Sequence, residues 1–540
     1  MTTIEQSVED GGSQVAGDSL AVAKWTLASR LTGFIRVLLV GAVLGPTQFG
    51  NLFTFANTLP WITFELAIGA LLASLVVPPL VERFDSGGAE AVSDLARNFT
   101  GVLIAAFSAV ALLVMVVSPF AARLFVSIAN IEAGTAADNY IGAAVPMLII
   151  TAPQIVGYGL AFTGVAVQNA VGRFAFPAAV PIVENIVVIG ALAIYAVVFE
   201  TGTTLEELTT GRWLLLAGGS SAGVAAHTVL QVWGARRAGV DMRPKAGWKD
   251  PAVRDIVRLA IPSSGVAVLN GARFILLSVA TSVVSGGLVA FQMALNFLNV
   301  PVALGAKPVA QAMLPQLSRH EANDDPEGWR EEYHRGLGLA ALIAIPAAVA
   351  IVAMARPLAL GTAFNELGSE FGRDLLTVSL IGAGLAVLGD ALFQVGTPSA
   401  YSRRNASDPV KAFAIRTGIT TAAVFGVWAL FDGVELILGI SLAVALGDIV
   451  GGVFLDRRIG ASWNSDGFNL RSSMLRSTGA ALLGFVPVAV AAHFVVQRFD
   501  DPPLSTAVAG VFGLIGLAAY FVIRHRMGSE EIQALRNSRG

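Results

Sequence analysis

The stretch WTLASRLTGFIRVLLVGAVLG, residues 25–45, has the length and apolar character of a membrane-spanning helix, yet it contains Arg30 and Arg36. About 20 consecutive apolar residues suffice to cross the hydrocarbon core of a bilayer. One arginine near the bilayer centre costs from about 2.5 kcal/mol upward, so it persists where it faces water, a counter-ion or a ligand. The stretch therefore predicts a membrane helix with a polar environment on at least one side.

The whole chain has the composition of a protein with many membrane spans. Of its 540 residues, 55% are hydrophobic and 14% are charged, against roughly 25% charged residues in soluble domains, and its mean hydropathy is +0.69. Fourteen sufficiently long apolar runs begin near residues 20, 54, 99, 140, 176, 213, 255, 287, 336, 374, 410, 434, 475 and 503. We therefore predict an all-α polytopic membrane protein with about 14 transmembrane helices.

The distribution of basic residues predicts the orientation of the chain. If both termini lie on one side, 24 of the 35 lysines and arginines fall on that side, and 5 fall in the opposite loops. Since cytoplasmic loops carry the excess of lysine and arginine, we expect both termini in the cytoplasm and the protein in the cell membrane. The polar first 19 residues lack the basic region of a signal peptide, so we expect the first helix to remain in the mature protein.

Two offsets within the sequence indicate an internal repeat. A shift of 237 residues sets Arg36 on Arg273 and Gly50 on Gly287, and a shift of 232 sets Gly157 on Gly389, Gly164 on Gly396 and Pro177 on Pro409. The repeat predicts two pseudo-symmetric, similarly oriented six-helix lobes around a central cleft, the architecture of an alternating-access transporter. The predicted parts are a polar cytoplasmic tail (1–19), an N-lobe (20–235), a basic cytoplasmic linker (236–254), a C-lobe (255–456), two extra helices (475–526) and a second cytoplasmic tail (527–540).

The intramembrane arginines point to an anionic ligand. The planar guanidinium binds phosphate oxygens through two parallel hydrogen bonds, so we expect Arg36 and Arg273, which the repeat pairs, to reach the cleft. The sequence LTG at residues 31–33 would let the first helix bend around such a ligand. The alternative is that these cations extend to the cytoplasmic interface, which applies most readily to Lys24 and next to Arg30.

Other polar residues within the spans are further candidates for the site. Glu65 could pair with an arginine of the first helix or exchange protons, and Glu184, Asp390 and Asp448 are candidates for proton or sodium coupling, with solvated carboxylates near helix ends as the alternative. The amides of Asn57, Asn296 and Asn299 would line the cleft or join helices. His227 and His493 lack ligand-spaced partners, so we expect no metal. In the absence of a nucleotide-binding motif or a long outer loop, we expect no cofactor, no nucleic-acid partner and no enzyme activity.

Three stretches carry a resemblance to a known family: SRLTGFIRVLLVGAVLG from Ser29, ANTLPWITFELAIGALLASLVVPPL from Ala56 and ALNFLNVPVALGAKPVAQAMLPQLSR from Ala294. They resemble the MurJ (MviN) branch of the multidrug/oligosaccharidyl-lipid/polysaccharide flippase superfamily, in its actinobacterial form. The chain departs from many proteobacterial members of that branch at Phe64, Glu65, Asn296 and Asn299, which replace charged residues there, and at Asn51, where an acid is expected.

The resemblance implies movement of lipid II, the undecaprenyl-pyrophosphate-linked peptidoglycan precursor, from the inner to the outer leaflet by alternating access. It implies that Arg30 and Arg36 engage the pyrophosphate, and that the partners are this glycan lipid, membrane lipids and proteins of cell-wall synthesis. We expect the two extra helices to form a groove for the lipid tail. Two alternatives are a flippase for another polyprenyl-linked oligosaccharide and a multidrug or cation antiporter of the same superfamily, whose cleft should be acidic.

Overall fold

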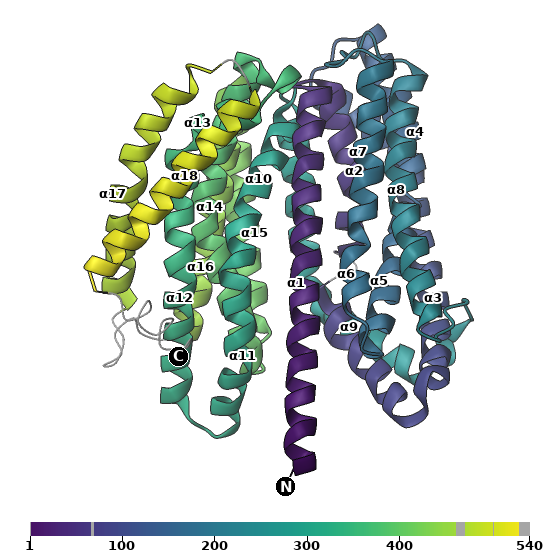
Figure 1. The fold of residues 1–540 in the computed structure, drawn as a ribbon. Helices are drawn as coiled ribbons and strands as arrows, with labels where there is room; N and C mark the ends of the chain where they lie inside the picture. The colour runs from purple at the N-terminus through teal and green to yellow at the C-terminus, as the bar shows by residue number, and fades with distance from the viewer. Residues whose placement is uncertain (1, 66–69, 461–469, 500–501, 529–540) are drawn as a thin grey trace. The chain divides into compact units, whose positions relative to one another are not determined.

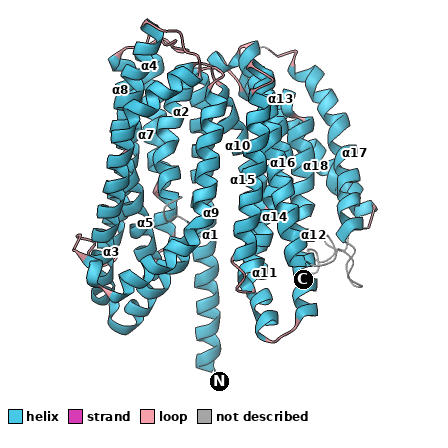
Figure 2. Ribbon diagram, turned by 180° about the vertical axis from the view of Figure 1, so that it is seen from behind, coloured by secondary structure: helices cyan, strands magenta, loops and turns pink. Residues whose placement is uncertain are grey.

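The computed structural model describes residues 2–65, 70–460, 470–499 and 502–528, and all regular structure in these ranges is helical (Figures 1 and 2). The first nine helices are α1 (Thr2–Leu44), α2 (Gln48–Phe64), α3 (Ala70–Ile128), α4 (Thr135–Thr151), α5 (Gln154–Ala170), α6 (Ala175–Ala179), α7 (Pro181–Val198), α8 (Thr210–Arg237) and α9 (Pro251–Ser282). The others are α10 (Gly287–Leu304), α11 (Ala306–Ala322), α12 (Pro326–Ala353), α13 (Ala355–Thr362), α14 (Glu370–Ser402), α15 (Ser407–Trp428), α16 (Gly433–Gly460), α17 (Leu470–Val496) and α18 (Pro502–Arg526).

The helices confirm a polytopic membrane protein. Among the described residues, 13 segments are long and apolar enough to cross a membrane, and each coincides with one of the fourteen predicted runs. The remaining run, which begins near residue 54, corresponds to α2. The long element α3 is two helices joined at Gly87 and Gly88. Gly88 has φ 64° and ψ −156°, a conformation that glycine alone adopts readily, so the sequence SGG reverses the chain there.

The chain divides into two compact units, which we describe separately. Unit 1 comprises Met1–Val43 and Leu52–Gly271, and unit 2 comprises Leu44–Asn51 and Ala272–Gly540. The division therefore falls within α9, between Gly271 and Ala272 and directly before Arg273, whereas the sequence predicts the start of the C-lobe at residue 255. The division of the remaining predicted parts stays a prediction.

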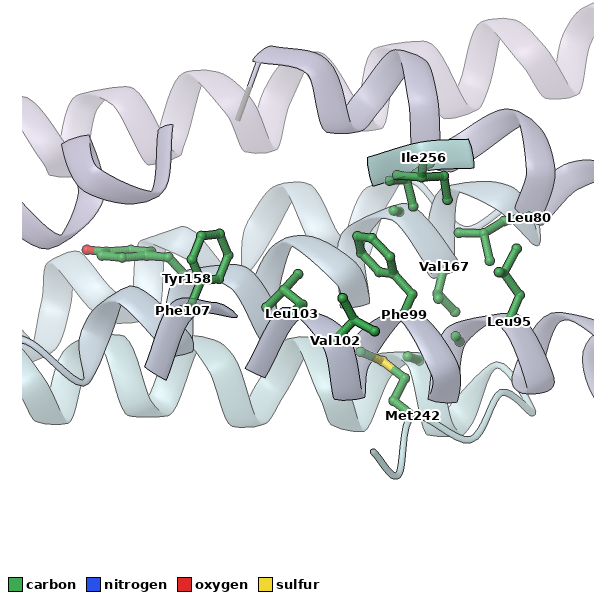
Figure 3. Close-up of a cluster of buried hydrophobic side chains, with 14 of the residues drawn as sticks. Leu80, Leu95, Phe99, Val102, Leu103, Phe107, Tyr158, Val167, Met242 and Ile256 are labelled. Carbon is green, nitrogen blue, oxygen red and sulfur yellow. The ribbon is translucent and has the colours of Figure 1, made fainter. Parts of the chain in front are cut away.

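The apolar core of unit 1 lies mainly between α3 and α5. Figure 3 shows Leu95, Phe99 and Leu103 of α3 close to Val167 of α5, together with Met242 from the segment that follows α8. The basic segment 236–254 is thus fixed to the unit: the Lys245 amide donates to the Arg97 carbonyl at 3.1 Å, and the Asn98 amide donates to Asp250 at 2.8 Å. Its acidic and apolar residues bind α3, which leaves its cations facing outward.

Asn51 ties the turn after α1 into unit 2. Its amide nitrogen donates to the carbonyls of Ser282 (3.2 Å) and Val284 (2.8 Å), and its oxygen accepts the N–H of Leu288 at 3.0 Å. An ionised carboxylate has no hydrogen to donate and would face two carbonyl oxygens here. The amide of Asn51 therefore binds both carbonyl oxygens, whereas the carboxylate expected from the resemblance would repel them.

The glycines that reveal the repeat make equivalent helix contacts in the two units. In unit 1, Gly157 of α5 lies against α8, where a Cβ would approach Val224 to 3.2 Å; in unit 2, Gly389 of α14 lies against α16, where a Cβ would approach the Asp448 carbonyl oxygen to 2.5 Å. Glycine permits such close approach because it has no side chain. The offset of 232 residues thus matches a shared packing rule within each unit.

Candidate functional site

Arg36 belongs to a buried charge cluster in unit 1. Its Nη1 lies 3.4 Å from Oε1 of Glu184 on α7, and the two side chains are 23% and 12% exposed. The same Oε1 accepts a hydrogen bond of 3.0 Å from the Tyr158 hydroxyl on α5, and Oε2 lies 2.8 Å from Nδ1 of His227 on α8. We call Arg36, Tyr158, Glu184 and His227 the Glu184 cluster. It combines one permanent cation, one carboxylate and one imidazole.

The polar residues ahead of Arg36 hold α7 against α1. The Asn185 amide donates to the Ser29 carbonyl at 3.2 Å and to the Thr32 hydroxyl at 3.0 Å. Because Asn185 follows Glu184, this contact sets the carboxylate beside Arg36. The bend expected at residues 31–33 is wrong for this structure: α1 is one unbroken helix from Thr2 to Leu44. The polar side chains there join two helices and do not open the helix around a ligand.

Arg30 and Arg36 differ in exposure. Arg30 is exposed and Arg36 is half-buried, as expected for residues six apart on a straight helix, which point about 120° away from each other. Lys24 is also exposed. Arg36, by contrast, lies against the carboxylate of Glu184. The two arginines therefore have different surroundings in unit 1.

A second charge cluster lies inside unit 2. Nη2 of Arg273 on α9 lies 2.5 Å from Oδ1 of Asp448 on α16. Arg416 on α15 binds both oxygens of the same carboxylate, at 2.7 and 3.1 Å, and lies 3.8 Å from Asp390 on α14. We call these four residues the Asp448 cluster. Its two guanidinium groups and two carboxylates balance in charge.

The structure corrects the expectation that Arg273 reaches a solvated cleft. The Arg273 side chain is 8% exposed, and that of Asp448, its partner, is 2% exposed. The reason is the acid on α16, because a paired guanidinium can be buried where an unpaired one cannot. Since the carboxylates of Asp390 and Asp448 both face guanidinium groups, a bound sodium ion or proton would compete with a guanidinium there.

The other predicted site residues are spread over both units. In unit 1, Asn57 accepts a hydrogen bond of 2.5 Å from Ser220 of α8, a contact that joins helices, and Glu65 is half-buried directly after α2. In unit 2, the Asn296 amide donates to the Gln292 carbonyl of its own helix at 2.8 Å, and Asn299 is exposed. The roles of these residues in binding stay predictions.

Sequence reasoning missed two members of the Glu184 cluster. The sequence pattern tests His227 only as a metal ligand, and it does not single out Tyr158. The signal available in the sequence was His227 within an otherwise apolar and small-residue run, SSAGVAAHTVL. A titratable ring inside a membrane helix needs a polar partner, and the preceding apolar run contains Glu184, which the sequence already marks as an ion-coupling candidate.

An apolar groove of about 540 Å³ lies in unit 2 between α12, α14 and α17. Of its 17 lining residues, only Thr478 carries a polar side-chain atom; the others include Leu337, Ala341, Ile345, Leu388, Met474 and Val486. We call it the α17 groove. The sequence placed a lipid groove at residues 475–526, and in the structure α17 contributes to a groove whose other walls are α12 and α14.

Comparison with known proteins relates these features to a family. The family model described as lipid II flippase MurJ matches residues 40–500. The chain is 25% identical over 431 residues to a probable lipid II flippase MurJ of Vibrio cholerae, which covers 79% of each protein. It is 26% identical over 406 residues to the lipid II flippase MurJ of Burkholderia cenocepacia, covering 73% of this chain and 74% of that one.

Solved structures support the same fold. A lipid II flippase MurJ in an inward closed conformation aligns with a TM-score of 0.69 at 16% identity, over 93% of this chain and 98% of that one. Since the family model matches residues 40–500 of 540, the match extends from the end of α1 to the end of α17. The chain belongs to the lipid II flippase MurJ family.

Proposed function

We propose that this chain is a flippase that moves the undecaprenyl-pyrophosphate-linked peptidoglycan precursor, lipid II, from the inner to the outer leaflet of the cell membrane by alternating access. The observation that carries the proposal is Arg36, a half-buried guanidinium on a membrane helix that lies 3.4 Å from its acidic partner, Glu184. That distance is longer than the 2.7–2.9 Å of a strong charge-assisted hydrogen bond. Arg36 therefore retains capacity for an anionic ligand.

The pyrophosphate fits Arg36 better than Arg273. The Arg36 side chain is 23% exposed, against 8% for Arg273, and Arg273 already binds a buried carboxylate. Arg30, exposed on the same helix, would meet the anion at an earlier or later step, since it points in another direction. In this proposal Arg273 stabilises unit 2. Arg273 could contact the substrate, as the sequence predicts, only if its ion pair with Asp448 opened.

The α17 groove fits the polyprenyl tail. Its walls are alanine, valine, leucine, isoleucine and methionine side chains with a single threonine, and each methylene buried there contributes about 0.8 kcal/mol. A branched hydrocarbon chain has the same chemistry as those walls. The tail would stay in an apolar environment while the charged headgroup crosses, which lowers the cost of carrying both through the protein.

The energy for transport would come from the membrane potential. With both termini in the cytoplasm, an interior-negative potential drives an anion outward, and 100 mV supplies about 2.3 kcal/mol for each elementary charge. No motif of the sequence resembles a nucleotide-binding loop. A proton or sodium ion on Glu184, Asp390 or Asp448 would then be an additional resetting device.

A multidrug or cation antiporter is the second candidate, because a multidrug resistance MATE family transporter aligns with a TM-score of 0.61 at 14% identity, over 82% of this chain and 98% of that one. Recognition of a cation calls for an excess of carboxylates. Neither charge cluster has one: Arg36 balances Glu184, and two arginines balance two aspartates in unit 2. A flippase for another polyprenyl-linked oligosaccharide would use the same pyrophosphate and tail contacts.

The test is a leaflet-resolved assay of lipid II in cells depleted of the protein and supplied with variants. Arg36→Glu should abolish translocation while the protein still inserts, because two carboxylates would then face each other at Glu184. Lys24→Gln, an exposed change on the same helix, is the control and should keep translocation. Normal outer-leaflet lipid II after depletion would refute the proposed substrate, and full activity of Arg36→Glu would refute the anion site.

A further inference from the structure

The Glu184 cluster contains a titratable group, His227, that anion binding by Arg36 does not require. His227 is 9% exposed overall, and its Nδ1 lies 2.8 Å from Oε2 of Glu184. Glu184 is also 9% exposed. A buried carboxylate could be satisfied by arginine and tyrosine alone. An imidazole is the side chain that changes charge most readily between pH 5 and 8.

The groups that face this pair come from two further helices. Arg36 of α1 and Tyr158 of α5 contact Oε1 of Glu184, which belongs to α7, and the Tyr158 ring lies edge-on to the His227 ring of α8, with 6.5 Å between centroids. Arg36 is the only permanent cation among these contacts, and Glu184 is their only carboxylate. The charge of the cluster therefore depends on His227.

We propose that His227 is a proton-binding site whose occupancy is linked to anion binding at Arg36. When His227 is neutral, its Nδ1–H donates to Glu184, and Arg36 and Glu184 cancel in charge. When Nε2 takes up a proton from water, the cluster carries one net positive charge, which a bound anion neutralises. By thermodynamic linkage, protonation favours the anion and the anion favours protonation to the same extent. The identity of the anion as a lipid pyrophosphate rests on the proposed function; the linkage itself does not.

In this geometry, protonation of His227 also affects Arg36 through Glu184, which both residues contact. A protonated imidazole at Oε2 draws the charge of Glu184 toward itself, so the carboxylate holds Arg36, 3.4 Å away at Oε1, less strongly. The guanidinium is then available to phosphate oxygens. The Asp448 cluster offers no equivalent, since its four charged groups are arginines and aspartates. The proposal thus assigns proton linkage to unit 1.

The experiment uses the purified full-length protein in detergent and inorganic pyrophosphate as the probe, with affinity measured at pH 5.5 and pH 8.0. His227→Gln can still donate to Glu184 but cannot gain a charge. We expect the ratio of affinities at the two pH values to fall by roughly fivefold or more in His227→Gln. His493→Gln makes the same substitution on α17 in unit 2, outside the Glu184 cluster, and should keep the wild-type ratio. Comparison of variants cancels the titration of pyrophosphate itself.

A second measurement needs no variant. Calorimetry of pyrophosphate binding near pH 7, in buffers of different ionisation enthalpy, reports the number of protons taken up on binding. For the wild-type protein this number should exceed the part contributed by the titration of pyrophosphate itself. An unchanged pH ratio in His227→Gln, an equal loss in His493→Gln, or no proton uptake would each overturn the linkage. Linked binding without lipid II translocation would refute only the proposed function, and translocation without linkage only this inference.

Discussion

Arg36 and Glu184 contact each other at 3.4 Å across 148 residues of sequence, with Arg36 on α1 and Glu184 on α7. The 237-residue offset of the repeat takes Arg36 to Arg273, and the 232-residue offset takes Glu184 to Arg416, both in unit 2. The position of the acidic Glu184 in unit 1 is therefore occupied by the basic Arg416 in unit 2. Unit 2 compensates with Asp448, which binds both arginines. In unit 1 a half-buried arginine faces one carboxylate, and in unit 2 the buried Arg273 and the partly buried Arg416 share Asp448.

Removal of the shared acid should destabilise unit 2. Asp448→Asn leaves the buried Arg273 without its carboxylate, and loss of one partner of a buried ion pair costs about 3–5 kcal/mol. Thermal unfolding of the purified protein in detergent measures the effect. Glu435→Gln, an exposed change on the same helix, should melt as the wild type does. Equal melting temperatures for Asp448→Asn and wild type would show that the cluster is not a stabilising element.

The close approach of α14 and α16 should not tolerate a methyl group. In Gly389→Ala the new Cβ would lie 2.5 Å from the Asp448 carbonyl oxygen, so a helix must move, at a cost of about 1–3 kcal/mol. Gly418→Ala of α15 meets open space and should be neutral or gain up to about 1 kcal/mol from helix propensity. The same melting experiment compares them, and a Gly389→Ala protein at least as stable as Gly418→Ala would contradict the packing argument.

A bulky residue in the α17 groove should weaken binding of the lipid tail. Val486→Trp fills space beside α12, and loss of about two buried methylenes, at ~0.8 kcal/mol each, lowers affinity roughly tenfold. Leu483→Trp lies on the same helix but does not line the groove. Native mass spectrometry with undecaprenyl phosphate distinguishes the two variants. If both bind the lipid equally well, the tail lies elsewhere.

Translocation should follow the membrane potential. In sealed vesicles with equal pH and sodium on both sides, a potassium-diffusion potential that is negative on the cytoplasmic side should accelerate outward flipping, since ~100 mV supplies about 2.3 kcal/mol per charge. Collapse of the potential with a potassium ionophore and balanced potassium is the control. Flipping that ignores the potential but responds to ATP added to the purified protein would exclude this energy source.

The fold was accessible from the sequence because lipid imposes strong rules on it. An apolar run long enough to cross the bilayer satisfies its backbone hydrogen bonds as a helix. Gly157 and Gly389 reveal the repeat because close helix packing leaves no room for a side chain at either position. The charge clusters were less accessible, because pairing depends on contacts between distant helices. Arg273 was expected in the cleft since its acid, Asp448, lies 175 residues later. His227 was tested against metal spacing, although its actual partner is a single carboxylate.

The burial of Arg273 also constrains how the protein is made. The ribosome adds about 5–20 residues per second, so α9 emerges on the order of 10 s before Asp448, 175 residues later, has been synthesised. Throughout that interval the guanidinium lacks its counter-ion, and an unpaired arginine in hydrocarbon costs at least about 2.5 kcal/mol. Nascent α9 should therefore remain beside the insertion channel, or at the lipid headgroups, until α15 and α16 arrive. Biogenesis of unit 2 would then be a late, concerted event rather than a helix-by-helix one.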